Sequence, residues 1–108
     1  MNATIYHNPR CGTSRATLRL LEEAGVDLDV VEYMTTPLAR GDLAALYRRA
    51  GVNPRDALRP DAPAAAKADD EAALDAMTAD PALIQRPIVA TAKGVVIARP
   101  PERVRDVL

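Results

Sequence analysis

The sequence predicts an α/β domain with a small mixed β-sheet, in the order β-α-β, helical insert, β-β-α. Three observations support this order. A short β-prone run, Ala3–Tyr6, leads into a segment with helical spacing, and a second β-prone run follows. Two further β-prone runs, Ile88–Thr91 and Val95–Ala98, flank a turn sequence of three residues. The long segment between the two pairs of runs carries helical spacing without strand signals. The whole chain has 108 residues, a length that suits a single domain over residues 1–108.

The first helix is predicted from apolar residues at helical spacing after Cys11. Leu18 and Leu21 define its buried face, and small or apolar residues lie alongside them, namely Ala16, Leu20 and Ala24. Gly25 suits the end of this helix, and Asp29–Tyr33 reads as the second strand. A helical connection between two such strands favours a right-handed crossover and parallel pairing.

The insert is predicted to hold two helices separated by irregular chain. The first closes at Gly51 and presents one apolar face, made of Leu43, Leu46, Tyr47 and Ala50. A short helical turn is expected over Pro54–Leu58, whereas Arg59–Asp70 reads equally as a loop or a weak helix. From Glu71 a second helix, with Ala73, Leu74 and Met77, is expected to end before Pro81.

The C-terminal part is predicted to be a hairpin followed by a helix. Ala92, Lys93 and Gly94 separate the two strands of the hairpin. Pro100 and Pro101 suit the first turn of the last helix, whose apolar face is Val104, Val107 and Leu108.

Composition excludes several classes of function. A net charge of −1 and a pI near 5.8 argue against general attraction to nucleic acid or to anionic membranes. The chain has no Trp or Phe, and therefore no aromatic platform for bases. No targeting or membrane-spanning segment is visible, so we expect a cytoplasmic protein. We also expect it to be a monomer. A single cysteine cannot form an internal disulfide, and one His with one Cys cannot complete a metal site.

The candidate reactive site is the turn between the first strand and the first helix. It contains the only cysteine, Cys11, and the only histidine, His7. A lone cysteine is usually a small buried side chain, but a thiolate at a helix N-terminus is favoured by the helix dipole and unpaired N–H groups. We expect Arg10, Arg15 or a protonated His7 to lower the pKa of Cys11 further. The same features attract an oxyanion, and Ser14 suits a helix cap.

Three segments resemble one known family. The sequence His-Asn-Pro-Arg-Cys-Gly-Thr-Ser-Arg at residues 7–15 is similar to the active-site loop of the glutaredoxin-coupled arsenate reductases of the ArsC family. Two later segments agree with that family in order, Arg86-Pro87-Ile88-Val89 and Arg99-Pro100-Pro101-Glu102. The resemblance implies a thioredoxin-like fold with the cysteine after the first strand. It also implies a cis peptide bond before Pro87.

The resemblance implies roles for individual residues. Cys11 matches the nucleophile, His7 a residue that influences its pKa, and Ser14 a hydroxyl that donates a hydrogen bond to the thiolate. The arginines that match oxyanion ligands are Arg59, Arg86 and Arg99, and the loop residue Arg15 joins them. Arginine suits a doubly charged tetrahedral oxyanion because its guanidinium offers several fixed donors. The chain before Arg86 is shorter than in the family, so Arg55 is an alternative to Arg59.

The resemblance also implies a reaction and its partners. Cys11 attacks arsenate, glutathione adds as a co-substrate, glutaredoxin completes the reduction, and arsenite leaves, with no bound cofactor and no metal. Three alternatives stay open: an Spx-like regulator that binds RNA polymerase, a related thiol oxidoreductase with another substrate, and a glutathione-binding module without turnover. Spx-like loops often carry Cys-x-x-Cys and lack the His-Asn-Pro lead, so His7 and Ser14 disfavour the regulator.

Overall fold

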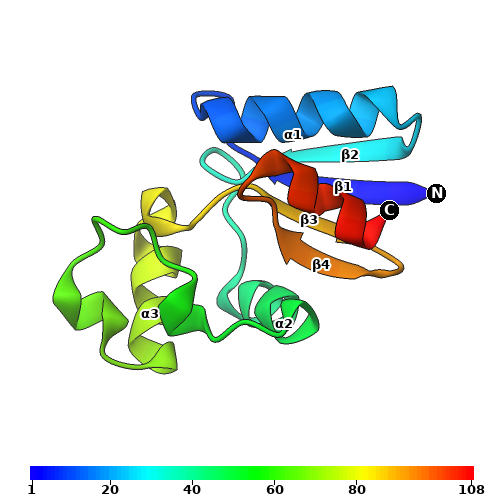
Figure 1. The fold of residues 1–108 in the computed structure, drawn as a ribbon. Coiled ribbons are helices and arrows are strands. Elements are labelled where there is room, and N and C mark those ends of the chain that lie inside the picture. The colour runs from blue at the N-terminus through cyan, green and yellow to red at the C-terminus, as the bar shows by residue number, and fades with distance from the viewer. The chain divides into compact units, whose positions relative to one another are not determined.

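The computed structural model describes residues 1–108 and contains the predicted elements in the predicted order (Figure 1). The chain divides into two compact units. Unit 1 comprises residues 1–36 and 86–108, and unit 2 comprises residues 37–85. Unit 1 holds the sheet, and unit 2 is the predicted helical insert.

The sheet of unit 1 has four strands in the order β2-β1-β3-β4. The strands are β1 (Asn2–His7), β2 (Asp27–Glu32), β3 (Ile88–Thr91) and β4 (Gly94–Ile97). β1 pairs in parallel with β2 and antiparallel with β3, and β3 pairs antiparallel with β4. The predicted mixed sheet is therefore confirmed, including the parallel β-α-β start and the C-terminal hairpin.

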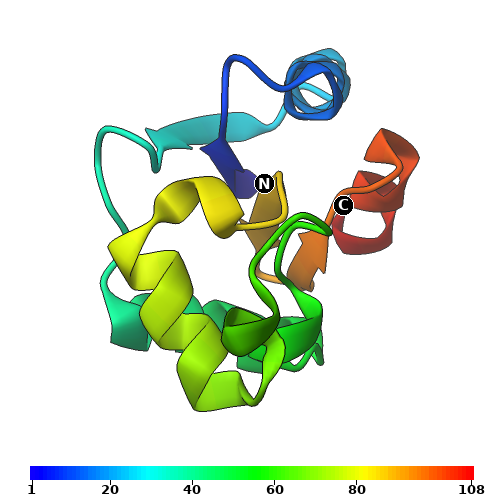
Figure 2. The ribbon, with the colours of Figure 1, turned by 90° about the vertical axis from the view of Figure 1, so that its left-hand side faces the viewer.

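Two helical elements cover one face of this sheet. α1 (Gly12–Glu23) and η4 (Pro101–Val107) contact each other and lie beside the sheet in both ribbon views (Figures 1 and 2). Leu21 of α1 is fully buried there in one cluster with residues of β1, β3, β4 and η4 and with Ala98, which follows β4; the other members are Ala3, Ile5, Val89, Val96, Val104 and Val107. Burial of these apolar side chains fixes α1, and hence its N-terminus, against the sheet.

The last helix differs from the predicted α-helix. η4 is a 3₁₀-helix of seven residues, with hydrogen bonds from Arg103 N to Pro100 O at 3.1 Å and from Leu108 N to Arg105 O at 3.3 Å. Two prolines at its start supply no N–H donors, and so short a segment gains little from α-helical bonding. Thr91 holds its end to the sheet, because the Thr91 hydroxyl donates to Val107 O at 2.6 Å.

Strand boundaries also differ by one or two residues from those predicted. β2 begins at Asp27 and ends at Glu32, because Asn2 pairs with Asp27 and His7 with Glu32. Tyr33 therefore lies outside the strand, although it is almost fully buried. The hairpin closes one residue earlier than expected, with Thr91 opposite Gly94.

Unit 2 consists of two α-helices and three short 3₁₀-helices. They are α2 (Arg40–Ala50), η1 (Pro54–Asp56), η2 (Ala64–Lys67), α3 (Asp70–Ala79) and η3 (Pro81–Leu83). The ambiguous segment before α3 thus contains one 3₁₀ turn, η2. α2 and α3 are joined by the buried Tyr47, whose hydroxyl donates to Met77 Sδ at 3.3 Å. Arg40 joins them a second time through ion pairs with Glu71 and Asp75.

Two peptide bonds before proline are cis, Arg86-Pro87 and Arg99-Pro100. The first confirms the expectation drawn from the family resemblance, and the second was not predicted.

None of the helices combines the length and the apolar character that crossing a bilayer requires.

Candidate active site

Cys11 lies at the N-cap position of α1, directly after the turn that follows β1. Its backbone is extended, and its N–H donates to Asn8 O at 3.0 Å, which closes the turn. The Asn8 side chain stabilises the same turn, because Asn8 Oδ1 accepts from Arg10 N at 3.0 Å. Sequence analysis assigned no role to Asn8, but an Asn followed by Pro9 is a recognisable turn signal.

Two arginines from distant segments meet the sulfur. Arg99 Nη1 lies 3.8 Å from Cys11 Sγ and donates to Arg86 O at 3.0 Å. A side-chain hydrogen bond from Arg86 is among the causes that lower the pKa of Cys11. The structure therefore brings together three of the predicted site residues at the N-terminus of α1.

Sheet register explains why these residues meet. Tyr6 near the end of β1 pairs with Ile88 at the start of β3, and Ile88 pairs with Ile97 at the end of β4. Because antiparallel neighbours run in opposite directions, the chain that leaves β1, enters β3 and leaves β4 lies at one end of the sheet. Arg86 precedes β3 and Arg99 follows β4, so both reach the same end as Cys11.

These surroundings favour the thiolate form of Cys11. Partial burial alone would raise the pKa of Cys11, but hydrogen bonds from the Ser14 N–H, the Arg86 and Arg99 side chains and the Thr13 N–H outweigh it. The pKa of Cys11 is therefore lower than that of an ordinary thiol, as expected from its helix position. The causes differ from those predicted, because the two distant arginines take the place of the neighbouring Arg10 and Arg15.

His7 acts on this loop through Ser14. His7 Nδ1 and Ser14 Oγ are 2.6 Å apart, and the Ser14 oxygen also accepts from Asn8 N at 3.1 Å. Both side chains are buried. No hydrogen bond joins the Ser14 hydroxyl to the Cys11 sulfur, and Ser14 does not cap α1; its oxygen instead contacts His7 Nδ1 and accepts from Asn8 N.

The charge expected on His7 is also corrected. Burial lowers the pKa of His7, the Glu32 carboxylate opposes this shift, and the Arg15 guanidinium adds to it. The imidazole is therefore neutral near pH 7, since the ordinary pKa of histidine is about 6.5. His7 supports the turn by hydrogen bonding instead of supplying a positive charge to the sulfur.

Arg15 supports the same turn from the other side. Arg15 Nη1 donates to Pro9 O at 2.9 Å, so the guanidinium spans the loop that precedes the nucleophile. This contact leaves further N–H groups of Arg15 available, because a guanidinium carries five donors. Its predicted role as an oxyanion ligand stays a prediction.

The remaining candidate arginines belong to unit 2. Arg59 Nη1 donates to Gln85 Oε1 at 2.8 Å, next to the bridge between Leu58 and Ile84. Arg55 Nε lies 3.9 Å from Asp70 Oδ1 in a partly exposed ion pair. Both residues thus have partners within their own unit, and the choice between them as a substrate ligand stays a prediction.

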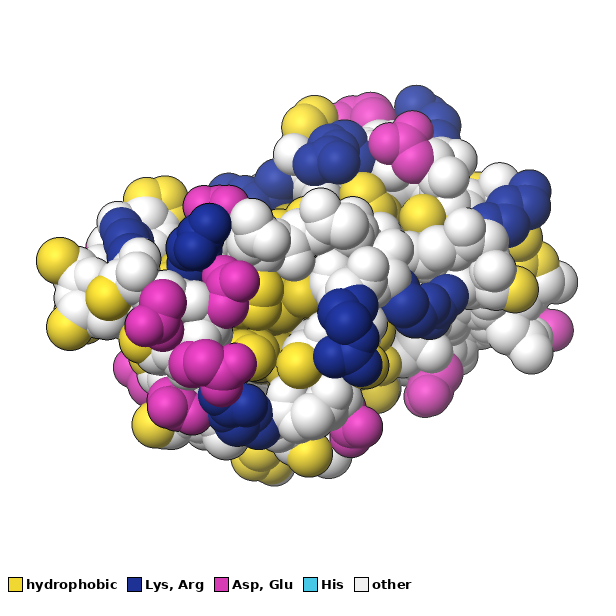
Figure 3. Space-filling model, turned by 90° about the horizontal axis from the view of Figure 1, so that it is seen from below, with side chains coloured by type: hydrophobic (Ala, Val, Ile, Leu, Met, Phe, Trp, Pro, Cys, Tyr) yellow, Lys and Arg dark blue, Asp and Glu magenta, His cyan; other side chains and the backbone are white.

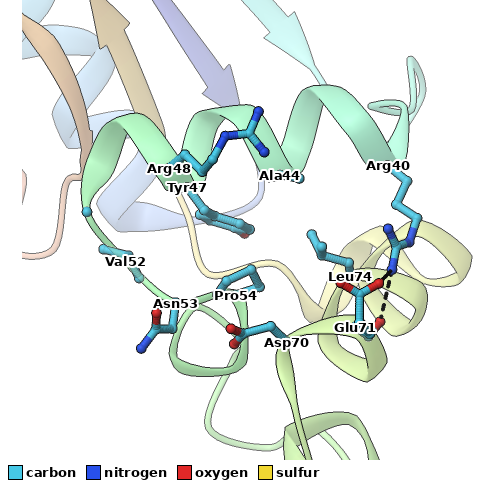
Figure 4. Close-up of a pocket in the computed structure, with 11 residues that line it drawn as sticks. Arg40, Ala44, Tyr47, Arg48, Val52, Asn53, Pro54, Asp70, Glu71 and Leu74 are labelled. Atoms are coloured by element: carbon cyan, nitrogen blue, oxygen red, sulfur yellow. Dashed lines mark hydrogen bonds and ion pairs between the residues drawn. The ribbon is translucent and has the colours of Figure 1, made fainter.

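Unit 2 contains a cavity that none of Cys11, His7, Arg86 and Arg99 lines. It measures about 620 Å³ and lies between α2 and the start of α3 (Figure 4). Tyr47, Pro54 and Leu74 form apolar parts of its wall, and Arg40 is bound to Glu71 at its edge. On the face shown in Figure 3, apolar side chains lie between acidic side chains and Arg or Lys side chains. The cavity is lined by neither the cysteine nor the histidine, so the chemistry favours Cys11 as the reactive centre.

The chain is similar to known proteins over nearly its whole length. The profile described as "ArsC family" matches residues 6–107. An arsenate reductase of Rhizobium meliloti is 43% identical over 115 residues, covering 100% of this chain and 82% of that protein. An arsenate reductase of Escherichia coli is 40% identical, covering 99% of this chain and 81% of that protein. The solved structure of an arsenate reductase from Vibrio cholerae is similar with a TM-score of 0.92 and 36% identity, covering 100% of this chain and 98% of that one.

Proposed function

Because the chain belongs to the ArsC family, we propose that it is an enzyme that reduces arsenate to arsenite with Cys11 as the nucleophile. One observation carries the proposal: Arg99 Nη1 lies 3.8 Å from Cys11 Sγ, and the Arg86 side chain acts with Arg99 to lower the pKa of Cys11. A thiolate beside two guanidinium groups and the N–H groups of a helix start suits attack on a bound oxyanion.

The first step is formation of a sulfur–arsenic bond. The Cys11 thiolate attacks arsenic(V), one arsenic–oxygen bond breaks, and that oxygen takes two protons and leaves as water. Arg86 and Arg99 stabilise the charge on the remaining oxygens, because charge-assisted hydrogen bonds from arginine match a tetrahedral oxyanion. The arsenic is not yet reduced at this stage.

Reduction requires two external thiols, because the chain has a single cysteine. In the proposed route the thiol of glutathione replaces a second arsenic-bound oxygen, which leaves as water. A glutaredoxin thiolate then attacks the glutathione sulfur, a disulfide forms, and the electron pair of the arsenic–sulfur bond reduces arsenic(V) to arsenic(III). Water cleaves the remaining bond to Cys11 and releases arsenite. In sum, arsenate and two thiols give arsenite, one disulfide and one water.

A coupled assay tests this proposal. Glutathione, glutaredoxin, glutathione reductase and NADPH are mixed with the enzyme, and NADPH oxidation is followed on addition of arsenate. We expect oxidation to depend on arsenate and to be abolished in Cys11→Ser. Absence of arsenate-dependent oxidation with the wild-type protein, also when dithiothreitol replaces glutathione in a direct arsenite assay, would reject the proposed function.

A further inference from the structure

A second cavity, which belongs to unit 1, adjoins the turn that carries the nucleophile. This loop cavity measures about 390 Å³, within the size range of small-molecule sites, and is lined by Asn8, Pro9, Arg10, Glu32, Met34 and Thr35. The bond from Cys11 N to Asn8 O closes a tight turn, in which the end residues have Cα atoms within about 7 Å. Asn8, which lines the loop cavity, and Cys11 are therefore the two end residues of one turn.

The loop cavity contains opposite charges that do not pair with each other. Arg10 and Glu32 both line it, and neither side chain forms an ion pair or a hydrogen bond within the chain. Asn8 adds a neutral donor: only 8% of it is exposed, its Oδ1 is occupied by Arg10 N, and its amide nitrogen has no partner in the chain. The cavity thus offers two kinds of donor for a carboxylate and one carboxylate for an ammonium group.

Apolar surface completes the loop cavity. Met34 is 43% exposed, one of the few large apolar side chains at the surface, and Pro9 lies on the opposite chain segment. A methionine thioether adapts its shape to aliphatic parts of a ligand. A molecule with an ammonium group, a carboxylate and a short aliphatic chain therefore matches every side of the cavity.

We propose that the loop cavity binds the zwitterionic γ-glutamyl end of glutathione, the thiol that follows arsenate in the reaction. This inference rests on the proposed function, which requires an external thiol at Cys11. Arg10 and Asn8 bind the γ-glutamyl carboxylate, Glu32 binds its ammonium group, and the aliphatic chain packs on Met34. The cysteinyl arm of the peptide then points its thiol toward the arsenic on Cys11.

Steady-state kinetics with matched variants test the loop cavity. Arg10→Gln and Glu32→Gln remove one charge each, and the controls Arg19→Gln in α1 and Asp29→Asn in β2 do the same at exposed sites outside the cavity. We expect the KM for glutathione to rise about fivefold in the first two variants, as for loss of a partly exposed ion pair. The KM for arsenate should change less than twofold, and the controls should match wild type. Loss of the Glu32 charge leaves His7 neutral, because that charge acts to raise the pKa of His7.

Glutathione analogues identify the contact. N-acetylglutathione lacks the ammonium group, so its KM should be about fivefold higher than that of glutathione for wild type and equal to it for Glu32→Gln. The glycine ethyl ester of glutathione retains the γ-glutamyl end and should match glutathione in both proteins. The inference would be overturned if the KM of the ester were as high as that of the acetylated peptide. It would also be overturned if acetylation still raised the KM in Glu32→Gln.

A binding experiment separates this inference from the proposed function. S-methylglutathione cannot react, and its titration should shift the methyl resonance of Met34 in wild type but not in the Arg10→Gln, Glu32→Gln double variant. If no thiol supports arsenate reduction, the proposed function fails, and this titration still shows whether the loop cavity binds the peptide. If wild type reduces arsenate but the Met34 resonance does not move and both KM values are unchanged in the variants, only the loop-cavity inference fails.

Discussion

At the scale of single residues, the thiolate form of Cys11 is favoured by groups from three parts of the chain. The Ser14 N–H and the side chains of Arg86 and Arg99 together lower its pKa against the effect of burial. We expect the alkylation rate of Cys11 to titrate with an apparent pKa below the reference of about 8.5. In Arg99→Ala the pKa should lie closer to that reference. An apparent pKa at or above it in wild type would contradict this account.

The lowered pKa of Cys11 makes the free energy of unfolding depend on pH. The pKa of Cys11 is lower in the folded than in the unfolded chain, so folding favours the deprotonated thiol. The resulting stability is fully present above the unfolded pKa of about 8.5 and is lost as pH falls through the folded pKa. Urea unfolding of wild type and Cys11→Ser should therefore show a free-energy difference that shifts in favour of wild type between pH 6 and pH 9. A difference independent of pH would disprove the shift.

The arginines should differ sharply in their effect on turnover. Arg86→Ala and Arg99→Ala each remove a charge-assisted contact, worth about 1.5–3 kcal/mol, and should lower arsenate turnover at least tenfold. Arg103→Ala is the control, because the Arg103 side chain is exposed on η4 and forms no hydrogen bond or ion pair within the chain. Arg59→Ala and Arg55→Ala, measured together, decide which of them is the third ligand. Equal losses at Arg99 and Arg103 would count against the assigned site.

At the scale of elements, α2 offers a test of local backbone rules. Gly51 follows the helix with φ of 68°, a left-handed conformation that favours glycine, whereas Gly41 lies in its first turn with negative φ. A Cβ at either position would meet no atom within 4 Å. Gly51→Ala should therefore destabilise the protein by about 1–2 kcal/mol through backbone conformation alone.

Gly41→Ala is the matched substitution and should stabilise by up to about 1 kcal/mol, because alanine has the higher helix propensity. Urea unfolding of both variants measures the two effects. The same sign for both would show that the conformation at Gly51 does not control the end of α2.

At the scale of the whole molecule, oxyanion binding separates an enzyme from a regulator with the same fold. An enzyme requires arsenate to occupy the space between Cys11, Arg86 and Arg99, whereas a regulator requires only a partner surface. We expect millimolar arsenate to slow alkylation of Cys11 in wild type but not in the Arg86→Ala, Arg99→Ala double variant, and phosphate or sulfate to compete. Alkylation is followed by mass spectrometry. Absence of protection, together with tight binding to the C-terminal domain of the RNA polymerase α subunit, would favour the regulator.

The sequence by itself determined the features that depend on neighbouring residues. Helical and strand periodicity located both α-helices of the insert and the four strands within a few residues, and the composition of residues 7–15 identified Cys11. Helix propensity did not predict the 3₁₀ hydrogen bonding of η2 and η4, which are short segments preceded by proline. The resemblance of two Arg-Pro segments to a known family singled out Arg86 and Arg99, although neither lies near Cys11 in sequence.

Only the tertiary structure decided which groups touch the sulfur and how. The register of β1, β3 and β4 brings Arg86 and Arg99 to Cys11, and no local pattern encodes a contact across 88 residues. Burial made His7 neutral and directed the Ser14 oxygen to His7 and Asn8 instead of the thiolate. These outcomes depend on which side chains are removed from water together, a property of the packed molecule that single residues do not carry.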